Sequence, residues 1–292
     1  MGDIFKNLIE SLFEIVIKTV DLSGTINTIA TNSYGLFNEN GPVSTIMGAI
    51  SVVGFSICAL FFIMSLVDLA MSDRFSIETF AKHFINLAIG VFGVTHAKYF
   101  VNFGWGLSEW VSNLIAKASI LGGGESTATI SAQASELVSS LDLSGLKWLA
   151  IGIAGMLIGL LGAIASAIAT AAVYLAGFSR LLEMGLRACF MPIGLAFMTD
   201  DGWKGAGGRY LKKFVSLCCQ GAAYVVVGKV HASLMVGAFV KIAEGVSSGS
   251  LEGVGASIGA LLSFTAILLA GTFAAVSLLF KCNSIVNDVF GV

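Results

Sequence analysis

The longest apolar run of the chain places the strongest constraint on its fold. Residues 148–178 contain no charged side chain over 31 positions, whereas an α-helix needs roughly 20 apolar residues to cross a hydrocarbon core about 30 Å thick. Charge-free runs also occupy residues 45–67 and 254–280. Charged residues make up only 12% of the chain, about half of what a soluble surface requires. The sequence therefore predicts an integral membrane protein and not a soluble enzyme.

Two weaker apolar runs, at residues 84–103 and 214–240, complete an all-α, polytopic arrangement of about five transmembrane helices. The expected regions, in chain order, are an extracytoplasmic N-terminal segment (1–44), transmembrane helices 1 and 2 (45–103), an extracytoplasmic loop (104–147), transmembrane helices 3 to 5 with a cytoplasmic hairpin at 180–213 (148–280), and a short cytoplasmic tail (281–292).

The N-terminal segment has helical periodicity but too many charges for a span. Charged residues interleave with apolar residues that recur every four positions, at Ile4, Leu8, Leu12, Val16 and Val20. This pattern indicates an amphipathic helix over residues 3–20, which lies in the membrane interface or packs on a neighbour.

The basic residues set the expected orientation, because Lys and Arg near short loops favour the cytoplasmic side. With the connection between the first two spans inside, nine of the sixteen basic residues lie inside and six outside. The inner nine are Arg74, Lys82, Arg180, Arg187, Lys204, Arg209, Lys212, Lys213 and Lys281. We therefore expect a multi-pass protein with its N-terminus out and its C-terminus in.

The same charges constrain the apolar segment 182–198. Glu183, Arg187 and Pro192 interrupt this segment, and basic residues stand on both sides of it. A sixth full span would move one of these basic groups outside. We favour a re-entrant or interfacial hairpin, in which Pro192 marks the break.

Small residues recur every four positions on two expected spans. They are Gly155, Gly159, Ala163 and Ala167 on the third span, and Gly255 and Gly259 on the fifth. Such stripes let another helix approach closely, which favours oligomeric packing, although incidental Ala and Gly richness is the alternative.

No set of residues indicates a catalytic or metal centre. The five cysteines lack C-x-x-C spacing, and the three histidines form no ligand cluster. We expect no cofactor beyond, at most, a bound phospholipid. Lys229 lies near the middle of its span, where an ammonium group that faces lipid costs at least about 2.5 kcal/mol. Lys229 and Gln220 are therefore candidates for a lumen or translocation path, unless the span is shifted and Lys229 lies at the outer interface.

The segment from Arg180 to Ala222 carries a more specific pattern. It contains, in order, Arg180, Glu183, Arg187, Pro192–Ile193, a Gly-rich turn, Arg209–Phe214 and Gln220–Gly221–Ala222. This segment resembles the TrbL-type (VirB-six-like) polytopic inner-membrane subunit of conjugative type IV secretion systems, most closely its Gram-positive version. The rest of the chain is similar to that family in outline.

The resemblance implies a scaffold or channel subunit of the bacterial plasma membrane. Its partners would be further copies in a ring-like homo-oligomer such as a pentamer, other secretion subunits including ATPases, membrane lipids, and a transient DNA–protein substrate. It also implies a role for charged residues that hold the cytoplasmic hairpin together and dock partners: Arg180, Glu183, Arg187, Arg209, Lys212 and Lys213.

Two other readings stay open. An ion-coupled secondary transporter would use Lys229 and Glu183 as a pair beside a broken helix. A pore or membrane anchor of phage or toxin origin is the second.

Overall fold

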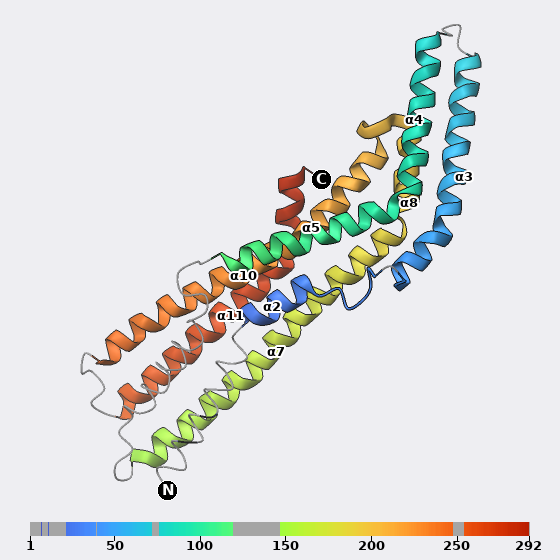
Figure 1. The fold of residues 1–292 in the computed structure, drawn as a ribbon. Coiled ribbons are helices and arrows are strands. Elements are labelled where there is room, and N and C mark those ends of the chain that lie inside the picture. Colours follow the sequence, from blue (N-terminus) through green and yellow to red (C-terminus); the bar gives the residue numbers. More distant parts are fainter. Residues whose placement is uncertain are drawn as a thin grey trace. The chain divides into compact units, whose positions relative to one another are not determined.

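The computed structural model describes residues 7, 11, 22–38, 40–71, 76–118, 147–247 and 254–291. The described part of the chain is helical and has no β-strand (Figure 1). Its elements are α2 (Leu22–Thr31), α3 (Pro42–Met71), α4 (Ile77–Thr95), α5 (Ala97–Lys117), α7 (Lys147–Cys189), α8 (Met191–Ala196), α9 (Met198–Asp201), the 3₁₀ turn η1 (Gly202–Lys204), α10 (Ala206–Ser247) and α11 (Val254–Phe290). The amphipathic helix expected over residues 3–20 lies outside the described residues, apart from Asn7 and Ser11.

Five of the described helices are long and apolar enough to cross a membrane, which confirms the all-α, polytopic class. The spanning segments are Pro42–Met71, Ile77–Thr95, Ile153–Cys189, Ala206–Met235 and Thr265–Phe290. The runs expected at 45–67, 214–240 and 254–280 fall within α3, α10 and α11 respectively.

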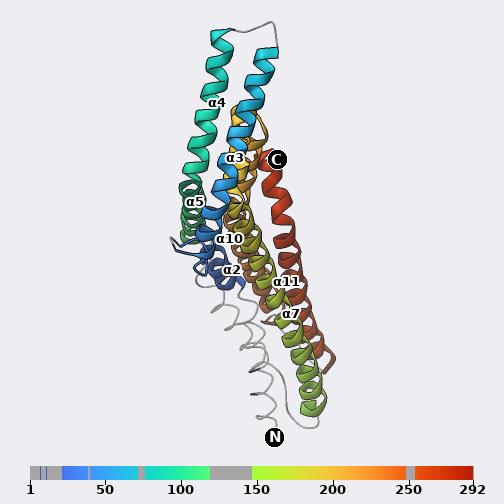
Figure 2. The ribbon, with the colours of Figure 1, turned by 90° about the vertical axis from the view of Figure 1, so that its right-hand side faces the viewer.

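The chain divides into two compact units. Unit 1 comprises Met1–Ile29, Leu114–Gly177 and Tyr224–Lys281, and unit 2 comprises Ala30–Asn113, Phe178–Ala223 and Cys282–Val292. Within unit 2, α3 and α4 run side by side, and α8 and α9 pack against both (Figures 1 and 2).

The boundary expected for the second span was wrong. The run at 84–103 crosses a break at His96, where α4 ends and α5 begins. Hydropathy does not register this break, because apolar residues continue on both sides of it. At the break the His96 side chain approaches the Phe92 carbonyl at 3.0 Å, and the rings of His96 and Phe92 stack.

The loop expected from residue 104 was also wrong over its first part, because α5 continues to Lys117. Small residues four positions apart, Gly104, Ser108 and Ser112, are buried along this helix. A Cβ atom at position 104 would lie 2.8 Å from Phe214. Small and polar residues that suggest a loop therefore form the packing face of a helix. Residues 119–146 lie outside the described residues.

The hairpin begins later than its expected bounds of 180–213. Helix α7 continues without interruption to Cys189, and the chain turns at Phe190 before Pro192 opens α8. The charges of Glu183 and Arg187 do not end the helix, since the two side chains pair one turn apart. The segment 190–205, which contains α8, α9 and η1, is called the turn region below. Pro192 marks its start, as expected, because proline fits the first turn of a helix and not its interior.

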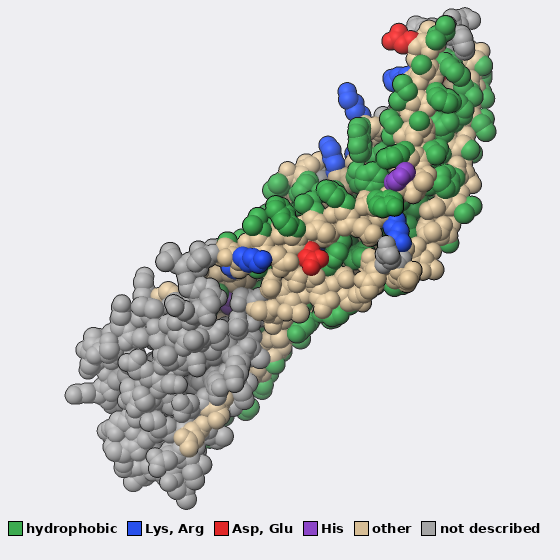
Figure 3. All heavy atoms as spheres, in the orientation of Figure 1, with side chains coloured by type: hydrophobic (Ala, Val, Ile, Leu, Met, Phe, Trp, Pro, Cys, Tyr) green, Lys and Arg blue, Asp and Glu red, His purple; other side chains and the backbone are tan. Residues whose placement is uncertain are grey.

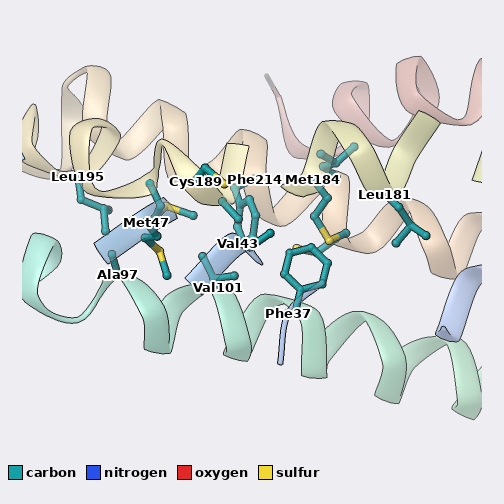
Figure 4. Close-up of a cluster of buried hydrophobic side chains, with 14 of the residues drawn as sticks. Phe37, Val43, Met47, Ala97, Val101, Leu181, Met184, Cys189, Leu195 and Phe214 are labelled. Carbon is teal, nitrogen blue, oxygen red and sulfur yellow. The ribbon is translucent and has the colours of Figure 1, made fainter. Parts of the chain in front are cut away.

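The core of unit 2 joins side chains from well-separated parts of the sequence (Figure 4). Phe37 stacks on Trp105 with ring centroids 5.1 Å apart. Phe214 is 1% exposed, and Met184 and Met191 are fully buried. The core therefore holds the segment 180–214 against α5 and the loop that precedes α3.

The outward faces of α3 and α4 are apolar (Figure 3). Only 17% of the spanning window is buried in each of these two helices. Exposed apolar residues on them include Val52, Leu60, Ile63, Phe84 and Ile85. An apolar surface of this extent suits contact with lipid and not with water.

Candidate functional site: a buried arginine and an exposed basic face

Arg180 is the largest fully buried side chain among the described residues, with 2% of its surface exposed. A buried guanidinium must satisfy up to five N–H donors, because desolvation without hydrogen bonds is costly. Arg180 donates to the Ser108 hydroxyl at 2.8 Å and to the carbonyls of Cys218 at 3.1 Å, Leu217 at 3.4 Å and Ala30 at 3.4 Å. One side chain thus connects α7 with α5, α10 and the last turn of α2.

Gly221 makes this arrangement possible. A Cβ atom built on it would lie 2.5 Å from Nη2 and 2.7 Å from Cζ of Arg180. Its neighbour Gln220 is 5% exposed. Gly221, in the Gln220–Gly221–Ala222 part of the sequence pattern, therefore lies against Arg180, which stands at the opposite end of the same pattern.

A second contact ties the end of α7 to the start of α10. Arg187 binds Oε1 of Glu183 through Nη2 at 2.8 Å and through Nε at 3.1 Å. The Tyr210 hydroxyl donates to the Arg187 carbonyl at 2.6 Å. The Tyr210 ring lies over Gly194, where a Cβ atom would come within 2.7 Å of the ring. Charged and aromatic residues thus close the turn region around α8.

The turn η1 and the start of α10 carry an exposed basic face, which comprises Lys204 of η1 and Arg209, Lys212 and Lys213 of α10. Trp203 beside it is 63% exposed. None of the four cations forms an ion pair with a described residue. Basic side chains stand out from the surface in Figure 3. Four unshielded positive charges and an exposed indole fit an anionic partner or a lipid headgroup region.

The six residues expected to act together in the hairpin and in docking therefore separate into two groups of three, one bonded within the chain and one exposed. Arg180 lies in the interior and donates to groups of its own chain, and Glu183 and Arg187 pair with each other. Arg209, Lys212 and Lys213 are exposed. The charge pattern did not distinguish the groups, because it reports which side of a membrane is favoured and not whether a residue is buried.

The residues expected to line a path also have distinct surroundings. Lys229 is half-buried, and its Nζ donates to the Ala118 carbonyl at 2.5 Å, just beyond the end of α5. Gln220 lies in the interior of unit 2. Glu183, the carboxylate expected to pair with Lys229, is bound by Arg187.

The small-residue stripes are only partly covered within the chain. Gly155 and Gly159 are buried, Ala163 is half-buried and Ala167 is exposed. Nothing lies within 4 Å of a Cβ atom built on Gly259. The exposed ends of the stripes are available to another helix, and oligomeric packing through them and through Gly255 stays a prediction.

Sequence reasoning missed Ser108, which accepts a hydrogen bond from Arg180. The signal was the spacing of Gly104, Ser108 and Ser112, which places all three on one face of a helix.

No protein-family model matches the chain, and no curated protein is significantly similar to it. What the fold defines is the class: a polytopic α-helical membrane protein, with five helices among the described residues that are long and apolar enough to span a bilayer. In the described part of the chain, no group of three or more His, Cys, Asp or Glu residues is placed to hold a metal ion.

Proposed function

We propose that this chain is a membrane scaffold or channel subunit of a conjugative type IV secretion machine, and that it acts as a ring-like homo-oligomer in a bacterial plasma membrane. It would help to pass a DNA–protein substrate across that membrane while partner ATPases supply the energy. The chain itself would carry out no chemical reaction.

The observation that carries the proposal is the way the family-like pattern folds back on itself. Arg180, at the start of the pattern, contacts Gly221 and Cys218 near its end. Tyr210, in the middle, binds the Arg187 carbonyl. If the pattern reflected only the composition of a membrane protein, its residues would have no reason to contact one another. In the structure these residues do contact one another. This supports the view that the resemblance reflects a shared folded element and not only shared membrane composition.

The same element fits a docking role. The core of unit 2 and the Arg180 contacts hold the start of α10, whose basic face is exposed to a partner. The hypothesis of an ion-coupled transporter gains no support, because Lys229 bonds to the Ala118 carbonyl and Glu183 bonds to Arg187.

Two measurements test the proposal. Purified chain in lipid nanodiscs should have the mass of a closed homo-oligomer, and single-particle images should show rotational symmetry. A strict monomer would overturn the ring. In a donor cell that carries the parent mobile element, removal of the chain should abolish DNA transfer while leaving the partner ATPases present. Unchanged transfer would exclude the secretion role.

The hairpin role has its own test. Glu183→Ala leaves Arg187 without the carboxylate that binds it. We expect weaker assembly and lower transfer, whereas Glu109→Ala, which removes an exposed carboxylate from α5, should change neither. Wild-type assembly and transfer in Glu183→Ala would show that the pair has no such role.

A further inference from the structure

A polar cleft lies between the end of α3 and the start of α4, within unit 2. Its volume is about 450 Å³, which falls in the size range of small-molecule sites. The cleft is lined by Ser65, Asp68 and Leu69 of α3, Thr79, Lys82, His83 and Asn86 of α4, and Asp200 of α9. Seven of these eight residues are polar or charged, although α3 and α4 are the least buried of the five described spanning segments.

The cleft is held in place by a contact to the turn region. Asn86 Nδ2 donates to the Asp200 backbone carbonyl at 3.2 Å, which links α4 to α9. Thr79 is fixed by the N-terminal cap of α4, since its backbone N–H donates to the Ser76 hydroxyl at 3.1 Å. The backbone positions of these lining residues are therefore set before any ligand binds.

The lining groups have both signs of charge. Asp68 and Asp200 supply carboxylates and Lys82 an ammonium group, and all three residues are exposed. Nδ1 of His83 is buried and has no hydrogen-bond partner in the described part of the chain. The ligand that complements such a set carries an anionic group for Lys82 and a cationic donor group for the carboxylates.

The surroundings of the cleft indicate where such a ligand is found. Six of the eight lining residues lie toward one end of two spanning segments, the end of Pro42–Met71 and the start of Ile77–Thr95. Phospholipid headgroups reside at the depth of such helix ends. Next to the cleft, Met64, Val67 and Phe84 expose large apolar side chains. A polar pocket bordered by apolar helix faces accommodates a headgroup in the pocket and acyl chains along the helices.

We propose that this cleft binds a phosphate ester that bears a primary amine, supplied by the headgroup of an ethanolamine phospholipid. Lys82 binds the phosphate, with the hydroxyls of Ser65 and Thr79 as further donors. Asp68 and Asp200 accept hydrogen bonds from the ammonium group. A choline headgroup has the same charges but no N–H donors, so the carboxylates discriminate against it.

Lipid retention tests the site. The full chain is reconstituted in nanodiscs with equal amounts of phosphatidylethanolamine, phosphatidylcholine and phosphatidylglycerol, and native mass spectrometry counts the lipids that stay bound. We expect phosphatidylethanolamine to exceed phosphatidylcholine by about tenfold, because a hydrogen bond between charged groups is worth about that factor in affinity.

Two variants and two matched controls locate the effect. Lys82→Gln loses the phosphate contact that both headgroups share, so it should reduce the retention of both lipids by about fivefold, whereas Asp68→Asn should reduce the preference for phosphatidylethanolamine by about fivefold. The controls remove the same charges from exposed positions on α11, as Asp288→Asn and Lys281→Gln. Both controls should leave the lipid retention and the lipid preference unchanged. Equal retention of all three lipids by the wild-type chain, or wild-type preference in Asp68→Asn together with wild-type retention in Lys82→Gln, would overturn the site.

A soluble probe distinguishes a phosphate ester carried by a lipid from a free phosphate ester. This test uses only the wild-type chain, so it does not depend on how the variants fold. Phosphoethanolamine is titrated against the wild-type chain loaded with phosphatidylethanolamine. If it leaves the lipid in place at millimolar concentration, the acyl chains contribute and the lipid is the ligand. If it displaces the lipid at equal concentration, the recognition of an amine-bearing phosphate ester stands and the assignment to a lipid is wrong.

Discussion

A Cβ atom on residue 221 would lie 2.5 Å from Nη2 of Arg180, so the buried guanidinium occupies space that only glycine leaves open. Gly221→Ala forces either the guanidinium or α10 to move, and overpacking of a filled interior costs about 1–3 kcal/mol. We expect a lower thermal unfolding midpoint for the purified chain in detergent. This loss of stability should occur without any change in the surface that faces lipid.

The same helix provides the control. Gly237 is exposed on α10, and nothing lies within 4 Å of a Cβ atom built on it. Gly237→Ala should therefore raise the midpoint slightly, because alanine in a helix interior is better than glycine by about 0.5–1 kcal/mol. Equal midpoints for the two variants would show that Arg180 does not fill the space opposite residue 221.

Arg180 itself should not tolerate lysine. The guanidinium reaches Ser108 on α5 and two carbonyls on α10, and a single ammonium group cannot span this set of acceptors. We expect Arg180→Lys to lower the free energy of unfolding by about 2–3 kcal/mol, since buried acceptors lose charged donors. The measurement is denaturant titration in mixed micelles. The conservative exchange Arg209→Lys on the exposed face should be neutral, and a comparable loss there would contradict the distinction between interior and surface.

The hydrogen bond from the Tyr210 hydroxyl to the Arg187 carbonyl predicts a smaller effect on stability, which can be measured independently of Arg180. Tyr210→Phe keeps the ring over Gly194 and removes only the hydroxyl, which donates at 2.6 Å. The expected cost is about 1 kcal/mol, the net value of one hydrogen bond. Tyr99→Phe removes the hydroxyl of a tyrosine that is 71% exposed and should have no effect. If both variants unfold like the wild type, the contact does not hold the turn region closed.

Hydropathy and charge predicted the class of the fold because they report directly on the solvent around each helix. Residues 45–67 and 148–178 lie within α3 and α7 for that reason. The same signals failed where a helix contacts protein instead of lipid. Helix α5 packs through Gly104, Ser108 and Ser112, which hydropathy assigns to a loop.

Arg180 illustrates the limit for the site. A basic residue at the end of an apolar run suggests a cytoplasmic position, because most such residues stop a span. Here the groups that accept its hydrogen bonds come from three other helices, which no local pattern can reveal. In the sequence, Gly221 stood out only as one residue of the pattern that ends in Gln220–Gly221–Ala222.

The basic face formed by η1 and the start of α10 should matter for partners and not for folding. Its four cations, Lys204, Arg209, Lys212 and Lys213, are exposed and pair with no described residue. Replacement of all four by glutamine should leave the unfolding midpoint within about 1 °C, since surface charges contribute little to stability. DNA transfer in a donor cell, or pull-down of the partner ATPase, should fall at least about tenfold if this face docks an acidic surface. A quadruple variant that transfers DNA normally would remove docking from the role of this face.

Lys229 yields the last prediction, because its contact explains why a cation is tolerated in a span. Its ammonium group donates to the Ala118 carbonyl beyond the last turn of α5, where carbonyls lack partners and the helix dipole favours a positive charge. Lys229→Arg retains a donor and should keep stability, whereas Lys229→Met should lower it by about 1 kcal/mol. A lysine that lines a conducting path would behave differently, since the arginine variant would then fold normally but change ion flux in liposomes. Thermal unfolding and flux measured on the same two variants therefore decide whether Lys229 caps a helix or lines a path.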